Sequence, residues 1–185
     1  MKSSILLVDD EPHVIAALKR ALGDEPYEIC TAASGAAGVK LFESQRFKVI
    51  ISDERMPGMA GDELLAVIKE RWPDTVRMML TGHASLEAAI KAVNKGEIYR
   101  FFTKPWNDME LILSIRSAME KYDLEAENRR LLKTVRNQSL ELKLLERSYP
   151  GIGRLEKDER GNVILPEMSE RELADIMAAC TKDGL

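Results

Sequence analysis

The chain has 185 residues, of which 45% are hydrophobic and 31% are charged, and its formal net charge is -4. This length suits one domain of roughly 100 to 150 residues with an appendage, and the composition can bury a core beneath a solvated surface. The acidic balance argues against a basic face for nucleic acid, and no apolar run reaches membrane-spanning length.

The first residues, MKSSILLVDDE, place three acidic residues directly after a short apolar run. That pattern does not fit the apolar region of a signal peptide, so we expect a cytoplasmic protein with no membrane partner. Cys30 and Cys180 lie far apart, outside any CxxC or Cys/His cluster. We therefore expect two reduced thiols rather than a disulfide or a metal site.

Five short β-type runs alternate with segments of helical period. The β-type runs are Ile5–Val8, Tyr27–Thr31, Val49–Ser52, Arg77–Thr81 and Arg100–Phe102. The segments with apolar residues at helical spacing are Val14–Leu22, Ala36–Phe42, Leu64–Trp72 and Leu86–Val93. This alternation predicts an α/β fold, a doubly wound five-stranded parallel sheet of the flavodoxin type with (βα)5 units.

Polar residues follow the predicted strands at the end where such a sheet binds its ligands. Asp9 and Asp10 come after the first strand, Asp53 after the third, Thr81 ends the fourth and Lys104 follows the fifth. Any one of them alone could be a helix cap or a turn residue, because Asp is favoured at N-caps. Their arrangement at the ends of several strands favours a single site.

The expected chemistry of this site is phosphoryl transfer to a carboxylate. Three converging carboxylates require a cation, and Mg²⁺ bound directly by Asp10 and Asp53, with Asp9 acting through a water, meets that need. A free oxygen of Asp53 could then attack phosphorus. Lys104 would meet the phosphoryl oxygens as a point charge, and the Thr81 hydroxyl would donate a hydrogen bond to another of them.

The segments ILLVDDE, ISDERMPGMAGDELL, MLTGHAS and YRFFTKPW strongly resemble the receiver domain of bacterial response regulators. The resemblance covers about residues 2 to 121. It implies strand order 2-1-3-4-5, phosphorylation at Asp53 by a histidine kinase or a phosphotransfer protein, and no enzymatic turnover beyond phosphorylation from small donors and dephosphorylation. It also implies further site features: an acidic pair in Asp9 and Asp10, a switch hydroxyl in Thr81, an aromatic switch residue in Phe101, a phosphate-contacting Lys104, a cis peptide before Pro105 and a metal-binding backbone carbonyl at Arg55.

A long helix is predicted after the receiver. Asn107 is a suitable N-cap with Glu110 three residues later, and neither Pro nor Gly interrupts the sequence until Pro150. Heptad positions can be assigned from residue 121 onward. One seam position holds Asn128, Val135 and Leu142, and the other holds Leu124, Leu131, Gln138 and Leu145. The pattern favours a parallel dimeric coiled coil, hence a homodimer through the C-terminal helix.

Two observations oppose the coiled coil. The pairs Glu120 with Glu125 and Glu141 with Glu146 would face like charge across a parallel dimer, and three leucines lie off the seam, namely Leu132, Leu140 and Leu144. A solvated single helix is the alternative. We predict a receiver at 1–121, a coiled-coil extension at 122–148 and a tail at 149–185. In the tail we expect a hairpin of residues 154–156 and 163–165 and a last helix beginning with a capping box at Ser169.

The sequence leaves three functions open. The first is a phosphorylation-controlled switch that changes dimer or downstream protein contacts. The second is the receiver part of a larger regulator with a cyclic-di-GMP phosphodiesterase output, because the YRFFTKPW ending resembles receivers that precede such enzymes. The third is a DNA-binding output, for which no recognition helix is evident. With histidines only at positions 13 and 83, a histidine-rich dimetal site is excluded within this chain.

Overall fold

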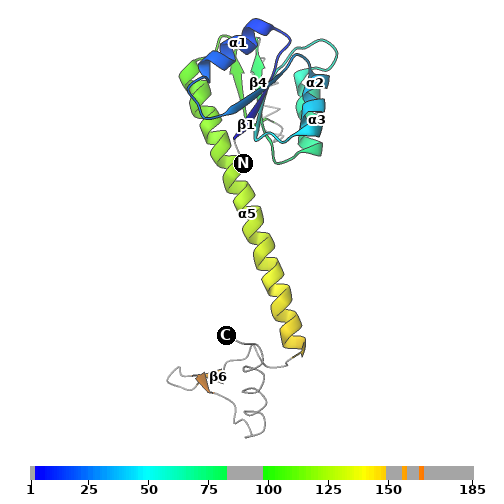
Figure 1. Cartoon of the computed structure of the whole chain (residues 1–185), viewed down its shortest axis with the longest axis vertical. Coiled ribbons are helices and arrows are strands. Elements are labelled where there is room, and N and C mark those ends of the chain that lie inside the picture. Colours follow the sequence, from blue (N-terminus) through cyan, green and yellow to red (C-terminus); the bar gives the residue numbers. More distant parts are fainter. Residues whose placement is uncertain (1–2, 83–97, 149–155, 158–162, 165–185) are drawn as a thin grey trace. The chain divides into compact units, whose positions relative to one another are not determined.

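The computed structural model describes residues 3–82, 98–148, 156–157 and 163–164 (Figure 1). The predicted helix Leu86–Val93, His83, and the predicted last helix after Ser169 lie outside these residues. The elements follow in the order β1 (Ser4–Val8), α1 (Pro12–Ala21), β2 (Glu28–Ala32), α2 (Gly35–Ser44), β3 (Val49–Asp53), α3 (Gly61–Arg71), β4 (Val76–Thr81), β5 (Arg100–Thr103), α5 (Asp108–Ser148), β6 (Glu156–Lys157) and β7 (Val163–Ile164).

The main sheet has five parallel strands in the order β2-β1-β3-β4-β5, which confirms the predicted doubly wound fold. Ile5 of β1 is paired with Ile29 on one side and with Val49 on the other. All five residues of β3 are buried, as expected for a central strand covered on both faces. The order reverses between β1 and β3, the position where such sheets bind ligands.

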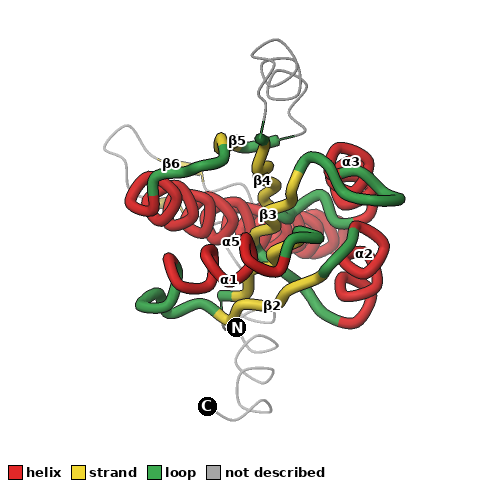
Figure 2. The backbone as a smooth tube through the Cα atoms, turned by 90° about the horizontal axis from the view of Figure 1, so that it is seen from above, coloured by secondary structure: helices red, strands yellow, loops and turns green. Residues whose placement is uncertain are grey.

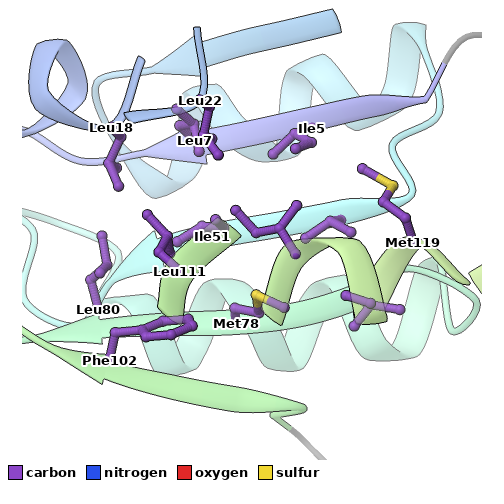
Figure 3. Packing of buried hydrophobic residues seen from close by; sticks show 14 of the residues in the cluster. Ile5, Leu7, Leu18, Leu22, Ile51, Met78, Leu80, Phe102, Leu111 and Met119 are labelled. Carbon is purple, nitrogen blue, oxygen red and sulfur yellow. The ribbon is translucent and has the colours of Figure 1, made fainter. Parts of the chain in front are cut away.

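Helices cover both faces of the sheet, with α1 and α5 on one face and α2 and α3 on the other (Figure 2). Alternate residues of β1 serve the two layers, because successive side chains of a strand point to opposite faces. Ile5 and Leu7 pack with Leu111 of α5 in the first layer, shown in Figure 3, whereas Leu6 and Val8 pack with helices of the second.

The loop from β3 to α3 returns closely to the end of β3. Gly58 has a φ of 84°, a backbone conformation that favours glycine. Gly61, the first residue of α3, donates its amide hydrogen to the Glu54 carbonyl at 2.9 Å. A Cβ at Gly61 would lie 2.0 Å from the Asp53 carbonyl oxygen, so only glycine fits there. The loop thus fixes the backbone on either side of Asp53.

The long helix α5 begins where the sequence predicts. The Asn107 side-chain oxygen accepts the amide hydrogen of Glu110 at 3.0 Å, which confirms the N-cap. Past residue 121, Asp123 is bonded to Lys48 at 2.6 Å and Arg129 to Asp74 at 3.2 Å. The first compact unit extends to Leu131 and so includes these contacts.

The second compact unit comprises residues 132–185. Its described part contains the end of α5 and a two-stranded antiparallel sheet, in which Glu156 is paired with Ile164 and Lys157 with Val163. The two strands of the predicted hairpin are therefore present. The first strand, Glu156–Lys157, ends one residue later than the predicted range 154–156. Within the described part of the chain, no helix is long and apolar enough to cross a membrane.

Candidate functional site

The polar residues predicted from sequence lie at the carboxyl ends of the strands. Asp9 follows β1, Asp53 ends β3, and Thr81 ends β4, and these three residues are buried, with exposures of 1%, 6% and 4%. Lys104 follows β5 and is half-buried. The backbone amide of Lys104 donates to the Thr81 carbonyl at 2.8 Å, which carries the lysine past the end of β4.

Lys104 joins the acidic residues of the site. Its Nζ lies 2.6 Å from Oδ1 of Asp53, 2.9 Å from Oδ2 of Asp9 and 3.5 Å from Oε1 of Glu11. Two carboxylates that are almost fully buried therefore share one cation. Breaking such a buried pair would leave uncompensated charge, so the lysine stabilises the local fold as well as supplying positive charge to the site.

Backbone amides hold the remaining oxygen of each buried carboxylate. Oδ2 of Asp53 accepts the amide hydrogen of Arg55 at 2.9 Å, and Oδ1 of Asp9 accepts that of Glu11 at 2.9 Å. Each donor lies two residues after its carboxylate, an arrangement common for Asp side chains in turns. The carboxyl groups are thereby oriented before any ligand arrives.

The electrostatics of the site follow from burial and from these contacts. Burial raises the pKa of Asp9, and the hydrogen bond from Lys104 offsets part of the effect. Burial alone would lower the pKa of Lys104, but its hydrogen bonds to Asp53 and Asp9 outweigh that effect and raise the pKa. The lysine therefore stays charged and available to an anionic ligand.

A small pocket opens beside the Asp53 carboxylate. Its volume is about 180 Å³, and it is lined by Glu11, Asp53, Glu54, Arg55, Gly82 and Lys104. Glu54 and Arg55 of this lining belong to the loop after β3. The space suits a small tetrahedral anion rather than an extended organic ligand, because typical small-molecule pockets are ~300 Å³ or larger.

Oxygen donors for a hard cation are present near this pocket. Asp10 is half-buried, and among the described residues its carboxylate has no hydrogen bond or ion pair. Within the described chain, no group of three His, Cys, Asp or Glu side chains is placed to hold a metal by itself. Magnesium needs only one or two carboxylates and completes its shell with water and phosphate, so the donor set fits it.

The remaining predicted features are a cis peptide bond, an aromatic residue and a backbone carbonyl. The Lys104–Pro105 peptide bond is cis, as predicted. Phe101 is half-buried and packs against the layer formed with α2 and α3. Arg55 has an exposed side chain and lines the pocket, with its backbone within the turn after Asp53.

Sequence reasoning missed two acidic residues, Glu54 and Glu11. Glu54 directly follows Asp53, lines the pocket and accepts the Thr81 hydroxyl at 2.5 Å through its Oε2. A glutamate just past a strand is usually solvated, so its type gives no signal. Only the position of Glu54 could have indicated its role, because the parallel strands β3 and β4 are neighbours and end side by side.

Comparison with known proteins places these features in a family. The family model of the response regulator receiver domain matches residues 5–116. The hydrogenase transcriptional regulatory protein HoxA of Cupriavidus necator is 38% identical over 130 residues, which cover 70% of this chain and 27% of that protein. The transcriptional regulatory protein GlrR of Escherichia coli is 34% identical over 144 residues, which cover 78% and 32%.

Solved structures give the same result. The signal receiver domain of an HD domain-containing protein from Pseudomonas fluorescens has a TM-score of 0.64 at 38% identity, covering 68% of this chain and 93% of that chain. A CheY-like receiver domain protein from Methanospirillum hungatei has a TM-score of 0.63 at 30% identity, covering 68% and 99%. The chain spans only about a quarter to a third of the length of the curated relatives.

Proposed function

The chain belongs to the response regulator receiver family, and we propose that Asp53 is the residue through which it accepts a phosphoryl group. It carries the receiver domain of two-component response regulators. The observation that most supports Asp53 is its contact with Lys104 at 2.6 Å beside a pocket of phosphate size. The donor would be a histidine kinase or a phosphotransfer protein of the cytoplasm.

The proposed reaction requires no proton transfer by the protein. A carboxylate oxygen of Asp53 forms a bond to phosphorus, and the bond from phosphorus to the leaving group breaks with its electron pair remaining on that group. Lys104, now bound to Asp53, would turn to the phosphoryl oxygens as a point charge. The Thr81 hydroxyl would donate to another of these oxygens, and Phe101 would respond as the aromatic switch residue.

Magnesium fits this proposal as the cofactor. When bound, the ion neutralises charge on the phosphoryl oxygens. Asp10 and Asp53 would hold it directly, the Arg55 backbone carbonyl would be a further ligand, and Asp9 would act through a water. The contacts support the direct role of Asp10, whose carboxylate has no hydrogen bond or ion pair among the described residues, whereas Asp9 contacts Lys104 and the Glu11 amide.

The test is phosphorylation of the full chain by acetyl phosphate with magnesium, read by intact mass. We expect one phosphoryl group per chain, lost in Asp53→Asn and kept in Asp24→Asn, which changes an exposed aspartate in the turn after α1. Incorporation at the wild-type level in Asp53→Asn would overturn the proposal. The chain would otherwise show only slow dephosphorylation and no turnover of a separate substrate.

The output proposed for the chain is a change of protein contacts. A homodimer through α5, over the extension 122–148, is supported by the exposed seam residues Leu124, Leu131, Val135, Leu142 and Leu145. A downstream protein partner is also proposed, and no nucleic-acid contact within this chain.

The alternative is that this receiver serves a larger regulator. It is favoured because the chain covers only 27% and 32% of two relatives' length, and because both relatives are named transcriptional regulatory proteins. We propose a cyclic-di-GMP phosphodiesterase output beside a DNA-binding one, because the chain resembles the receiver of an HD domain-containing protein. The position of the stop codon in the gene, compared with the intact mass of the native protein, would decide between them.

A further inference from the structure

Glu54 places a negative charge in the pocket that the phosphoryl group would enter. Its backbone amide donates to the Leu80 carbonyl at 2.8 Å, which holds the residue beside the end of β4. Its side chain is half-buried, and Oε2 accepts the Thr81 hydroxyl at 2.5 Å. Glu54 therefore lines the pocket and also binds the hydroxyl that the proposed reaction uses.

The Glu54 carboxylate and a phosphoryl oxygen would compete for the Thr81 hydroxyl. A hydroxyl has one hydrogen to donate, so Thr81 cannot donate to Glu54 and to a phosphoryl oxygen at the same time. Accommodating the phosphoryl group thus requires the Glu54 carboxylate to give up this bond. Its charge remains in the pocket, where repulsion between a carboxylate and a phosphate is poorly screened in a half-buried site.

We propose that Glu54 is a specificity-determining residue of the phosphorylation pocket, which occupies the Thr81 hydroxyl before phosphorylation and disfavours strongly anionic phosphoryl donors. The proposal rests on Asp53 being the phosphoacceptor. The step makes no bond to Glu54: the new bond joins an Asp53 oxygen to phosphorus, and the electron pair of the broken bond leaves with the acetate or amine of the donor. The consequence is protection from small anionic phosphate esters and anhydrides.

The experiment compares two donors on the full chain with magnesium. Acetyl phosphate carries more negative charge at neutral pH than phosphoramidate, whose nitrogen is protonated. In Glu54→Gln the amide oxygen can still accept from Thr81, but the charge is gone. We expect the initial rate with acetyl phosphate to rise about tenfold and the rate with phosphoramidate to rise less.

Further variants separate charge from hydrogen bonding. Glu54→Asp keeps the charge on a side chain one methylene shorter, so discrimination against acetyl phosphate should persist while the Thr81 contact weakens. The matched control is Glu70→Gln on α3, an exposed glutamate outside the pocket, which should behave as wild type. Unfolding curves of all variants verify that the receiver stays folded.

Binding of beryllofluoride, an anionic phosphoryl analogue, supplies a readout other than reaction rate. By calorimetry its dissociation constant should fall about tenfold in Glu54→Gln and stay unchanged in Glu70→Gln. If Glu54→Gln keeps the donor preference and the analogue affinity of wild type, the role proposed for Glu54 is overturned, and the role proposed for Asp53 is not. A wild-type chain whose phosphorylation does not depend on Asp53 would instead overturn the proposed function.

Discussion

The strand-end site and the exposed stretch of α5 differ in how their side chains are satisfied. At the site, buried Asp9 and Asp53 are each held by Lys104 and by a backbone amide. In α5, large apolar side chains stay in contact with water, with Leu124 exposed at 72% and Leu142 at 64%.

This difference separates the properties that one chain has by itself from those that require a second surface. The buried carboxylates of the site have their hydrogen bonds and ion pairs within one compact unit, so their geometry does not require a partner. The apolar surface of α5 gains free energy only when another surface covers it, roughly 1.5 kcal/mol or more per large side chain. Catalysis of phosphoryl acceptance should therefore be local, and association should depend on α5.

The largest expected effect follows from removing that apolar surface. In the 185-residue chain, Val135→Glu together with Leu142→Glu places charge at two seam positions and should convert a dimer into a monomer. The matched control is Leu140→Glu, which changes a leucine off the seam and should leave the dimer intact. Sedimentation at equal concentrations checks this: a monomeric wild type, or equal losses in both variants, contradicts the coiled coil.

A related change tests the polar seam position. Asn128→Ile replaces the amide expected between two parallel helices with an apolar side chain. Dimer stability should rise and the choice of oligomer should loosen, because such an Asn specifies a two-stranded register at a cost in stability. An unchanged association constant and a single species in sedimentation would show that Asn128 does not face a partner helix.

The next effect compares the buried sheet with the helix surface. Ile51 is fully buried in the central strand, whereas Leu132 of α5 is exposed at 65%. Ile51→Ala should lower the free energy of receiver unfolding by roughly 2 to 5 kcal/mol, and Leu132→Ala by less than about 0.5 kcal/mol. Urea unfolding followed by tryptophan fluorescence measures both. Similar losses would mean that α5 is covered in solution.

A smaller effect distinguishes the two acidic residues after β1. Asp10→Asn should weaken magnesium binding about tenfold more than Asp9→Asn, because a direct ligand is lost in the first case and a water-mediated contact in the second. Titration of Trp106 fluorescence measures the affinity, with Asp24→Asn as the control. Equal losses in the two variants would contradict the assignment of the direct ligand.

The sequence predicts the sheet well because its central strands are almost continuously apolar. It is less accurate where polar residues form the end of an element. The apolar period placed the third helix at Leu64, but α3 begins at Gly61, since its first turn is polar. Tyr27 was assigned to a strand, yet its amide donates to the Glu25 carbonyl in a turn, and β2 begins one residue later.

Convergence of the site residues could be predicted, but their pairing could not. Strand order alone brings Asp9, Asp53 and Lys104 to one edge of the sheet. That the lysine bonds to both carboxylates, and that Glu54 accepts the Thr81 hydroxyl, depends on register and on side-chain rotamers. The ion pairs of Asp123 with Lys48 and of Arg129 with Asp74 likewise join residues distant in sequence, so the sequence alone does not predict them.

The smallest expected effect concerns two ion pairs of similar geometry in different surroundings. Arg116 of α5 donates to both oxygens of Glu25 at 2.6 and 3.1 Å, and the Glu25 side chain is only 8% exposed. Arg130 lies 3.0 Å from each oxygen of Glu127, where both side chains are at least half exposed. Exposed pairs contribute little to stability, so only the first should matter for the receiver.

The pH dependence tests this difference. The hydrogen bond from Arg116 lowers the pKa of Glu25 below its ordinary value of 4.5. A lowered pKa in the folded state adds stability above the ordinary value, and that stability is lost as the pH falls through the folded value. In urea unfolding, the free energy of unfolding of Glu25→Gln should therefore be lower than that of wild type at neutral pH and equal to it in acid. That of Glu127→Gln should equal the wild-type value at every pH. A Glu25→Gln deficit that persists unchanged in acid would mean that the side chain acts through packing rather than charge.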